Sequence, residues 1–437
     1  MFQVNDSSSL FYDLYQLTMS QSYWRAGREP TAIFELYIRD MPSNRGYIVL
    51  NGIRQALDAI RNLNFQKSDM DALNSLERFD RKFIDYLGNI EFTGTVRGMQ
   101  DGDIIFAEEP VLQVQAPIIQ GQLLETMLIN CVNYSSIVAT KCSRVKYSAG
   151  PKEIVDFGAR RAHGKDAADT LARAGYLTGF QGTATVTTGV NFSIPMFGTM
   201  AHSYIMAFEN EIDAFRSYAK EFPNTCTLLV DTYDTLSGVK NADTVAKELE
   251  LTGNKLRAIR LDSGDYLTLS VKARHILNSS GLNYVDIVAS GGLDEYRIKE
   301  LEIGEAPIDI YGVGTKIAVS EDAPWLESVY KMVEIDSRPV NKSSDGKKSY
   351  PYKKNILRKH DSKGNFVEDF VLSNQNISDY DGCTSLLSTY IEHGKTIKKH
   401  SGLTDSRSHH REQFAKLDDS YKSISQPHKY PVSINLE

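Results

Sequence analysis

Cysteine is scarce in this sequence. Its 437 residues include only Cys131, Cys142, Cys226 and Cys383, and no two of these form a Cys-x-x-Cys pair. A disulfide framework and a zinc knuckle both need more cysteines at closer spacing, so the sequence predicts neither. We expect four reduced thiols in a cytoplasmic protein.

Long apolar runs and an excess of positive charge are also missing. No stretch approaches the ~18 apolar residues that suggest a membrane-spanning helix, and the N-terminal MFQVNDSSSLFYD is too polar and acidic for a secretory signal. The 49 Lys and Arg are outnumbered by 56 Asp and Glu, which gives a formal net charge of -7. Nucleic-acid binders usually carry a basic face. We therefore expect neither a membrane nor a nucleic acid as partner.

The composition suits a large folded protein, since 41% of the residues are hydrophobic and the length is enough for two or three domains. Ser7 to Ser9 are candidates to cap the first helix, and Gly27 to end it. The expected elements of the first part are a helix over 10–27, a strand over 31–41, helices within 53–90, a compact β module over 91–117 and a long amphipathic helix, with a break, from about 120.

Seven short apolar runs follow, each ending in glycines or charged residues: EIVDFGARR, GYLTGFQGT, IPMFGTMAHS, CTLLVDTYDT, RAIRLDSGD, VDIVASGG and IDIYGVGTK. Helical segments separate most of them, which indicates a parallel α/β architecture with its polar residues at the strand ends. An open doubly wound sheet is the alternative. We favour a barrel, because no Gly-x-Gly-x-x-Gly opens the first unit. Residues 401–428 predict a loop or irregular helix.

Glycines end the last two of these runs. IDIYGVGTK contains Gly314 and Thr315, and the preceding run ends in Ser290, Gly291 and Gly292. Glycine lets the backbone approach an anion closely, and two late strands with Gly-rich ends are typical of a phosphate site in a barrel. Tight turns without a ligand would show the same residues.

Carboxylates end two other runs. RLDSGDY places Asp262 and Asp265 around a turn, with Arg260 on the same side of the strand as Asp262. Such a set can hold Mg²⁺ through its waters or bind sugar hydroxyls, although a surface salt bridge would look alike. Asp231 and Asp234 in LVDTYDT either complete a cation site or cap the next helix.

Paired arginines follow the first run, in VDFGARRAHG. Arg160 or Arg161 can clamp a carboxylate through two parallel hydrogen bonds, while its neighbour reaches a phosphate. Arg144, in the preceding helix, can add another guanidinium. Solvated arginines remain the alternative.

The histidine of GTMAHSY, His202, lies between a predicted strand end and a predicted helix. A metal-binding role would need partner ligands, and neither His-x-His nor His-Glu-x-x-His surrounds it. A nucleophile or a base needs only exposure at the strand-end face. A buried structural histidine fits this stretch equally well.

Eight motifs in order resemble the nicotinate phosphoribosyltransferase family: DLYQLTM, FELYIRDMP, DFGARRAHG, GTMAHSYIMAF, LVDTYDT, IRLDSGD, ASGGLDEYRI and GVGTK. The resemblance covers about residues 11–334 and continues more weakly to the C-terminus. It implies a type II phosphoribosyltransferase fold, an irregular, incompletely closed parallel α/β barrel with an N-terminal α/β domain that the C-terminal segment completes. The domains are then expected at 1–120, 121–335 and 336–437, in a homodimer with active sites at the subunit interface.

The same resemblance implies the reaction. The family joins nicotinate to phosphoribosyl pyrophosphate, giving nicotinate mononucleotide and pyrophosphate, in the salvage route of NAD biosynthesis. ATP hydrolysis drives the step through a phosphohistidine, which makes the enzyme formally a ligase, and Mg²⁺ is required. His202 matches the phosphorylated histidine, and we expect Asp231 or Asp234 to hold its second ring nitrogen. Some relatives carry a zinc site, for which this chain lacks the residues.

Carried over by motif, the expected catalytic residues are His202, Asp262 and Arg260. Tyr15 matches an aromatic residue that stacks on the pyridine ring from the partner subunit. The complete set of expected substrate-binding residues is Tyr15, Arg39, Arg144, Arg160, Arg161, Thr199, Ser290, Gly291, Gly292, Gly314, Thr315 and Lys353.

Two departures from the family pattern stand out. The loop expected as Gly-Thr-Ser-Asn is Gly182-Thr183-Ala184-Thr185 here, so a hydroxyl contact is lost or moved. Tyr352 replaces a glycine in the basic loop over 347–354, so the family pattern does not predict the conformation of that loop.

Three other functions share parts of this pattern. A nicotinamide phosphoribosyltransferase has a neutral acceptor and no need for paired arginines, because an unpaired buried arginine is costly. A quinolinate phosphoribosyltransferase binds two carboxylates and has no GTMAHS-type loop. A non-catalytic phosphosugar-binding protein has no use for a nucleophile at His202. The sequence favours nicotinate as the acceptor.

Overall fold

The computed structural model describes residues 10–342, 350–373 and 380–436. The chain forms two compact units, which we call unit 1 (Met1–Thr140 and Ala323–Glu437) and unit 2 (Lys141–Asp322). Within the described ranges, no helix is both long enough and apolar enough to cross a membrane. The three-part division expected at residues 120 and 335 stays a prediction.

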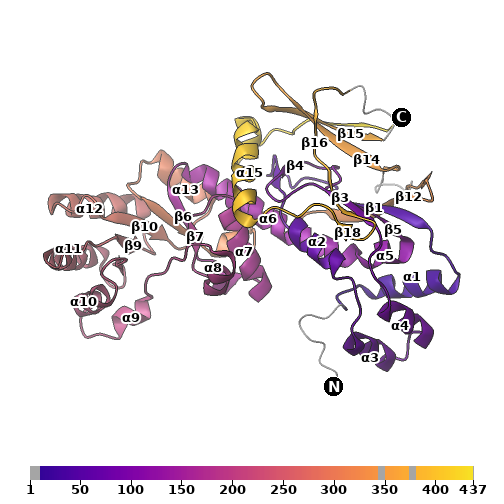
Figure 1. Ribbon diagram of the computed structural model, residues 1–437. Coiled ribbons are helices and arrows are strands. Elements are labelled where there is room, and N and C mark those ends of the chain that lie inside the picture. Colours follow the sequence, from indigo (N-terminus) through magenta and orange to yellow (C-terminus); the bar gives the residue numbers. More distant parts are fainter. Residues whose placement is uncertain (1–9, 343–349, 374–379, 437) are drawn as a thin grey trace. The chain divides into compact units, whose positions relative to one another are not determined.

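Unit 1 is built around an antiparallel sheet of seven strands, in the order β13-β12-β1-β5-β3-β17-β18 (Figure 1). Its strands are β1 (Thr31–Ile38), β3 (Thr95–Gly98), β5 (Leu112–Pro117), β12 (Ser328–Ile335), β13 (Arg338–Pro339), β17 (Ser388–Glu392) and β18 (Lys395–Thr396). Segments from both ends of the chain thus share one sheet. The C-terminal segment completes it through β17, which pairs with β3.

The strand expected over 31–41 is confirmed as β1, but its burial differs from the expectation. Every residue of β1 except Thr31 is buried, so the alternation in its sequence does not mark a solvent face. The polar member is Glu35, whose Oε2 lies 2.6 Å from Lys354 Nζ in a buried ion pair. A charge paired in this way can occupy an interior position.

Unit 1 also contains smaller sheets and several helices. Its sheets are completed by β2 (Ile48–Val49) with β4 (Ile104–Ile105), and by β14 (Lys354–His360), β15 (Phe366–Ser373), β16 (Thr384–Ser385) and β19 (Val432–Asn435). Its helices are α1 (Leu14–Arg25), α2 (Ile53–Arg61), α3 (Lys67–Ser75), α4 (Arg81–Gly88), α5 (Ile118–Leu123), α15 (Leu403–Lys416) and α16 (Asp419–Lys422).

Two helices differ from the sequence expectation, α1 at its start and α15 over its whole length. α1 begins after Asp13, which forms a capping box with Gln16, and Ser7 to Ser9 lie outside the described residues. Gly27 follows the helix at φ +60°, as expected for its end. The prediction of a loop or irregular helix over 401–428 is wrong for α15, a regular helix of 14 residues. Its buried residues are the polar Ser406 and His410, so an apolar stripe could not reveal it.

The long helix from about residue 120 is confirmed, and so is its break. α5 ends at Leu123, and α6 (Glu125–Ala149) begins two residues later. α6 runs through the boundary between Thr140 and Lys141, so it belongs to both units.

Unit 2 holds a parallel sheet of six strands in the order β7-β6-β11-β10-β9-β8 (Figure 1). The strands are β6 (Glu153–Asp156), β7 (Gly182–Thr183), β8 (Thr227–Leu229), β9 (Ala258–Leu261), β10 (Asp286–Ser290) and β11 (Ile310–Val313). The helical segments are η1 (Ala159–Arg161), α7 (Lys165–Leu177), α8 (Val186–Phe192), α9 (His202–Met206), α10 (Glu211–Glu221), α11 (Thr235–Leu251), α12 (Tyr266–Ser279), α13 (Glu295–Ile303) and α14 (Thr315–Ala318).

The strand order is that of an incompletely closed barrel. Each strand from β8 to β10 pairs with the next one along the chain, and the first strand, β6, pairs with the last, β11. The order ends at β7 and β8, so the opening lies between them. One side chain each from β6, β9, β10 and β11 forms an interior cluster: Val155, Ala258, Val288 and Ile310. The fold class expected from the sequence is confirmed.

The run IPMFGTMAHS forms no strand of this sheet. It contributes a single bridge, between Thr183 and Met196. Pro195, which has no N–H, offers only its carbonyl, which accepts from the N–H of Thr183. The segment that crosses the barrel opening is therefore held by a few bonds rather than by a ladder, and it carries His202.

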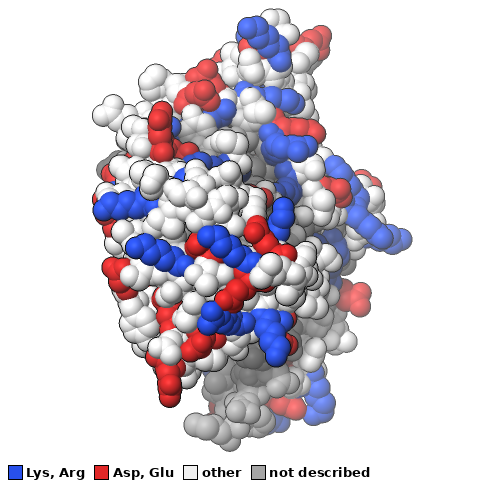
Figure 2. Space-filling model, turned by 90° about the vertical axis from the view of Figure 1, so that its left-hand side faces the viewer, with Lys and Arg blue, Asp and Glu red and all other residues white. Residues whose placement is uncertain are grey.

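Charges of both signs cover the face that Figure 2 shows, with Lys and Arg lying among Asp and Glu. Among the ion pairs of the described residues, Arg216 Nη2 on α10 is 2.6 Å from Glu248 Oε1 on α11. The face in Figure 2 offers no broad basic surface of the kind that a nucleic acid requires.

Candidate active site

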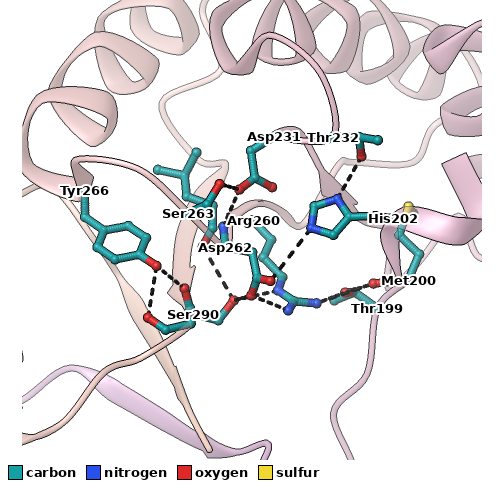
Figure 3. A network of polar contacts seen from close by, with 12 residues as sticks. Thr199, Met200, His202, Asp231, Thr232, Arg260, Asp262, Ser263, Tyr266 and Ser290 are labelled. Carbon is teal, nitrogen blue, oxygen red and sulfur yellow. Dashed lines mark hydrogen bonds and ion pairs between the residues drawn. The ribbon is translucent and has the colours of Figure 1, made fainter. Parts of the chain in front are cut away.

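A polar network occupies the carboxyl ends of β8, β9 and β10 (Figure 3). Arg260 lies on β9, Asp262 directly follows that strand, Ser290 ends β10, and Asp231 lies two residues beyond β8. Neighbouring parallel strands end at the same edge of a sheet, and this brings residues from three separate motifs together. The loop before α9 joins the network through Thr199 and Met200, and α9 joins it through its first residue, His202.

Arg260 is the centre of this network. Its Nε donates to Ser290 Oγ at 2.7 Å, and its Nη2 donates to Asp262 Oδ1 at 2.6 Å. Its Nη1 donates to Thr199 Oγ1 at 3.2 Å and to the Met200 carbonyl at 3.4 Å. One guanidinium thus fixes the His202 loop to the ends of β9 and β10.

Asp262 is an ionised acceptor. Burial by itself would raise the pKa of this carboxyl, but the hydrogen bond from Ser290 Oγ, 2.5 Å long, and the charge of Arg260 together hold its pKa below the usual value. Its side chain keeps 25% exposure. A carboxylate held in this way can meet positive charge that develops on a substrate.

Asp231 anchors the turn that carries Asp262. Its Oδ2 accepts from the backbone N–H of Asp262 at 2.9 Å and from Ser263 Oγ at 2.6 Å. Its Oδ1 is buried and has no hydrogen-bond partner in the described part of the chain. An unpaired carboxylate oxygen near a second carboxylate fits Mg²⁺, which takes one or two carboxylates and completes its shell with water and phosphate.

No group of three or more His, Cys, Asp or Glu side chains within the described ranges could by itself hold a metal ion. The residues that suit Mg²⁺ here are accordingly a pair, Asp231 and Asp262. Asp265 is separate from them, because its Oδ2 accepts from Thr268 Oγ1 at the start of α12.

His202 is the first residue of α9, and its side chain is 38% exposed. Its Nε2 lies 3.8 Å from Asp262 Oδ2, and its Nδ1 lies 3.0 Å from Thr232 Oγ1. The expectation that Asp231 or Asp234 holds the second ring nitrogen is wrong. Asp231 binds the turn after β9, and Asp234 caps α11 by accepting from the N–H of Ser237.

The glycines after β10 adopt conformations that only glycine reaches easily. Gly291 has φ +92° and Gly292 has φ +66°. A Cβ at Gly291 would lie 2.3 Å from the Asp262 carbonyl oxygen, whereas one at Gly292 would meet nothing within 4 Å. Tyr266 Oη donates to the carbonyls of Ser290 and Gly291, and burial together with the charge of Asp262 raises the pKa of Tyr266 to about 12. The phenol therefore stays a donor that holds this loop.

The glycine after β11 lies at the neighbouring strand end. Gly314 packs closely enough that a Cβ there would lie 3.0 Å from the Phe157 carbonyl oxygen, and Thr315 is exposed. Lys316 ties this end to α13 through an ion pair with Asp294, at 2.7 Å. Because β10 and β11 are paired, the two Gly-rich ends are adjacent, as a shared phosphate site requires.

Arg160 and Arg161 are exposed on η1, directly after β6. The buried Asp156 shapes this turn, since its Oδ1 accepts from the N–H of Gly158 and its Oδ2 accepts from Thr183 Oγ1, both at 2.7 Å. Burial raises the pKa of Asp156 to about 6. Sequence reasoning missed this residue, although an aspartate at a strand end just before a glycine is a signal for such an anchor.

Arg144 lies apart from this network. Its guanidinium is fully buried, with Nε 2.9 Å from Glu295 Oε1. Lys141 Nζ lies 2.6 Å from the other oxygen of Glu295 and 2.8 Å from Asp322. The structure thus places Arg144 in an interior ion-pair cluster of unit 2.

Three expected site residues belong to unit 1, and the others to unit 2. Tyr15 is 45% exposed and lines a pocket of about 330 Å³ together with Glu125, and burial and its hydrogen bond to Glu125 raise the pKa of Tyr15. Lys353 Nζ donates to Gln115 Oε1 at 3.1 Å. Arg39 is half-buried, and its backbone N–H donates to the carbonyl of Glu327.

Comparison with known proteins gives family matches along most of the chain. Models of the nicotinate phosphoribosyltransferase N-terminal domain, of the family itself and of its C-terminal domain match residues 10–133, 152–374 and 360–437. The chain belongs to the nicotinate phosphoribosyltransferase family. It is an enzyme of NAD biosynthesis with that family's activity, as the sequence motifs predicted.

Similar proteins of this family occur in bacteria and in humans. A nicotinate phosphoribosyltransferase of Mycobacterium tuberculosis is 40% identical over 98% of this chain and 91% of its own length. One of Bacillus subtilis is 37% identical over 99% of this chain and 94% of its own length. The crystal structure of human nicotinic acid phosphoribosyltransferase superposes with a TM-score of 0.87 at 26% identity, covering 98% of both chains.

Both departures from the nicotinate phosphoribosyltransferase pattern are accommodated locally. Thr183 Oγ1 donates to Asp156 and accepts from the N–H of Thr185, so the hydroxyl next to Ala184 is engaged within the fold. Tyr352 has φ +72°, so it keeps a left-handed conformation in which glycine would be unstrained. Residues 347–349 of that loop lie outside the described residues.

Proposed function

We propose that this nicotinate phosphoribosyltransferase joins nicotinate to phosphoribosyl pyrophosphate and couples the step to ATP through phosphorylation of His202. The observation that carries the proposal is the contact of His202 with the network of Arg260, Asp262 and Ser290. A nucleophile, a carboxylate and a phosphate-binding arginine then lie within one site. A protein that only binds phosphosugars would have no use for the first of these.

The two ring nitrogens of His202 have different environments. Thr232 Oγ1 can accept a hydrogen bond from Nδ1–H, which leaves the lone pair on Nε2. In the phosphorylation step, Nε2 forms a bond to the γ-phosphorus of ATP, and the bond from that phosphorus to the bridging oxygen breaks and releases ADP. Arg260, 2.6 Å from Asp262, is placed to balance the added negative charge.

In the transfer step, the ring nitrogen of nicotinate forms a bond to C1 of the ribose, and the bond from C1 to the pyrophosphate oxygen breaks. The leaving pyrophosphate takes the electron pair. Asp262 would stabilise positive charge on the ribose, and the turns at Gly291, Gly292 and Gly314 would hold the 5′-phosphate. Asp231 and Asp262 would hold Mg²⁺, which supplies charge neutralisation for the phosphates.

The carboxylate of nicotinate would bind to Arg160 or Arg161. Both are exposed on a turn that Asp156 fixes, so a guanidinium is available for bidentate binding. A charge-assisted pair of this kind contributes roughly 1.5–3 kcal/mol, which corresponds to about 10- to 100-fold in kcat/KM. Nicotinamide, which lacks the negative charge, should be used that much less well.

The deciding assay measures nucleotide formation from labelled phosphoribosyl pyrophosphate with nicotinate or nicotinamide, with and without ATP. Nicotinate should be preferred by at least 10-fold, and the wild type should carry an acid-labile phosphoryl group. His202→Ala should lose nicotinate-dependent ATP hydrolysis while it keeps a slow transfer without ATP, because the substrates are still oriented. Equal use of the two acceptors, or ATP hydrolysis undiminished in the variant, would reject the proposal.

Other properties of the enzyme follow from its family and stay predictions for this chain: a requirement for Mg²⁺, assembly as a homodimer with Tyr15 supplied by the partner subunit, a pyrophosphate contact by Arg39 and Lys353, a substrate contact by Arg144, and a cytoplasmic location. Arg144, however, already forms a buried ion pair with Glu295. A substrate contact would require that pair to be shared or broken.

A further inference from the structure

Unit 1 contains a polar cavity of about 240 Å³ to which the proposed reaction assigns no role. Its walls come from the end of β3, from β14, from the segment of β16 and β17, and from α15. The basic and acidic side chains that line it are Asp103, Arg358, His360, Lys398, His409 and Lys416. Five of these six carry or can carry a positive charge.

Among the residues that line the cavity, Arg358 gives the strongest indication that a hydrogen-bond acceptor binds there. Its side chain is 1% exposed, and its Nε and Nη2 bind Asp369. Its Nη1 is buried and has no hydrogen-bond partner in the described part of the chain. A guanidinium N–H₂ group that is removed from water and left unpaired is costly, and an acceptor in the cavity would relieve that cost.

The lysines of the cavity have no carboxylate partner among the described residues. Lys398 Nζ donates to Ser388 Oγ at 3.0 Å and lies over the ring of Tyr390, and Lys416 Nζ is without a salt bridge in the described ranges. The single acidic wall residue, Asp103, is already occupied, since its Oδ1 is 2.6 Å from His409 Nε2 and its Oδ2 accepts from the N–H of Gln100. Lys398 and Lys416 therefore carry positive charges that no carboxylate of the described residues neutralises, whereas the charge of Arg358 is paired with Asp369.

We propose that this cavity binds a small oxyanion of two or more negative charges, of the phosphate or pyrophosphate type. Hydroxyl groups of Thr384 and Ser385 in the wall add donors for its remaining oxygens. The volume is below the 300–1,000 Å³ typical of sites for larger organic ligands, which favours a small ligand. Lys398 and Lys416 supply the charge that opposes it, and Arg358 supplies a fixed hydrogen-bond donor.

The test compares two lysine double variants of the full-length enzyme by isothermal titration with inorganic phosphate and with pyrophosphate, at ionic strength matched with chloride. Lys398→Ala with Lys416→Ala removes the charge of the cavity. Lys395→Ala with Lys399→Ala removes equal charge from exposed positions that do not line it. Anions can also bind at the candidate active site. Because both double variants keep that site intact, a difference between their isotherms reports on the cavity alone.

The wild type and the control variant (Lys395→Ala with Lys399→Ala) should each show one anion site that the cavity variant (Lys398→Ala with Lys416→Ala) lacks. Alternatively, the cavity variant should bind the anion at that site with a Kd at least 10-fold higher. Turnover of nicotinate without added phosphate should be alike in all three proteins, which shows that the fold is intact. A phosphate-soaked crystal should place the anion within hydrogen-bond distance of Arg358 Nη1. Identical isotherms for the two double variants, or density for phosphate confined to the candidate active site, would overturn the proposal.

Discussion

Thr232 is the residue on which the direction of the His202 ring depends. Its hydroxyl is 3.0 Å from Nδ1, and the opposite nitrogen faces Asp262 at 3.8 Å. A hydroxyl can accept the proton of Nδ1, and this fixes the tautomer in which Nε2 is the nucleophile. Thr232 thus acts as a positioning residue for a reaction in which it takes no direct part.

Replacing Thr232 by valine should slow phosphorylation of His202 by about 10-fold, the equivalent of one lost hydrogen bond. The reason is that valine keeps the shape of the side chain but leaves Nδ1 without an acceptor. Rapid-quench measurement of acid-labile phosphate gives the rate. Thr232→Ser should restore it, since the serine hydroxyl can take the same position, and a slow Thr232→Ser protein together with a fast Thr232→Val protein would contradict this role.

Asp156 couples the stability of the arginine turn to pH. Its pKa is raised by burial to about 6, above the value of 3.8 for an unperturbed aspartate. Between these values the folded protein keeps a proton that the unfolded chain has lost, so this carboxyl favours the folded state at low pH. That contribution is complete below pH 4 and is lost as the pH rises through 6.

Asp156→Asn should remove this dependence, because an amide does not titrate in this range. Measured from pH 4 to pH 7, the free energy of unfolding of the wild type relative to the variant should fall by about 3 kcal/mol. Denaturant titrations at a series of pH values give the two curves. Parallel curves would show that the carboxyl does not carry the raised pKa.

The sequence could identify the chemistry of single residues but not the partners of each. Arg260, Asp262 and Ser290 were found because strand-end positions and motifs mark them, and the structure places them within hydrogen-bond distance. The sequence predicts Asp231 or Asp234 as the partner of His202, because both follow the adjacent strand, whereas the structure shows the hydroxyl of Thr232, which lies between them in the chain. Which neighbouring side chain contacts the His202 ring depends on the backbone angles of the loop, and these angles cannot be inferred from the residue types.

At the scale of elements, the turn before β14 stores backbone strain. Tyr352 has φ +72°, and its carbonyl oxygen accepts from Lys354 Nζ at 3.0 Å. Lys354 also binds Glu35 in the middle of β1, so the buried pair holds the turn in a conformation that a tyrosine avoids. The strain at one loop residue is therefore maintained by the sheet.

Tyr352→Gly should be more stable than Tyr352→Ala by roughly 1 kcal/mol, because both lose the ring but only glycine is unstrained at positive φ. The order of their unfolding temperatures tests this. At Glu412, which is exposed within α15, the order should be reversed, since glycine there weakens a helix relative to alanine. A lower unfolding temperature for Tyr352→Gly than for Tyr352→Ala would mean that no strain is held there.

Helices and strands can be predicted from the sequence where their buried residues are apolar and recur at helical or strand spacing. They cannot be predicted in this way where the buried residues are polar. The break between α5 and α6, the parallel strands and the Gly-rich ends all left clear patterns. α15 buries serine and histidine instead of apolar residues, so its helix has no apolar stripe. The run around Pro195 has the composition of a strand but only a single bridge, because its position at the barrel opening is a property of the whole sheet.

For the whole molecule, the expected site residues are divided between the two units. Tyr15 lies in unit 1 and His202 in unit 2. If Tyr15 covers the nicotinate ring in the site of the neighbouring subunit, a mixture of Tyr15→Ala and His202→Ala proteins should regain activity. Random pairing makes half of the dimers mixed, with one intact site in each, so about a quarter of wild-type activity is expected.

The measurement is nicotinate turnover with ATP before and after subunit exchange, with mass spectrometry of the intact dimers as the check on exchange. Each variant alone should be nearly inactive. Verified exchange without recovery would mean that each site is built from one chain.

β1 leaves the ribosome early, whereas its neighbour β12 and the lysine that neutralises Glu35 are made only after all of unit 2. Until then the nascent chain carries an unpaired strand edge and an uncompensated carboxylate. Unit 2 is one continuous stretch of chain, so its first strand, β6, pairs with a strand of the same stretch, β11. The yield of folded enzyme in a cell therefore depends on how well chaperones shield the first 140 residues during translation.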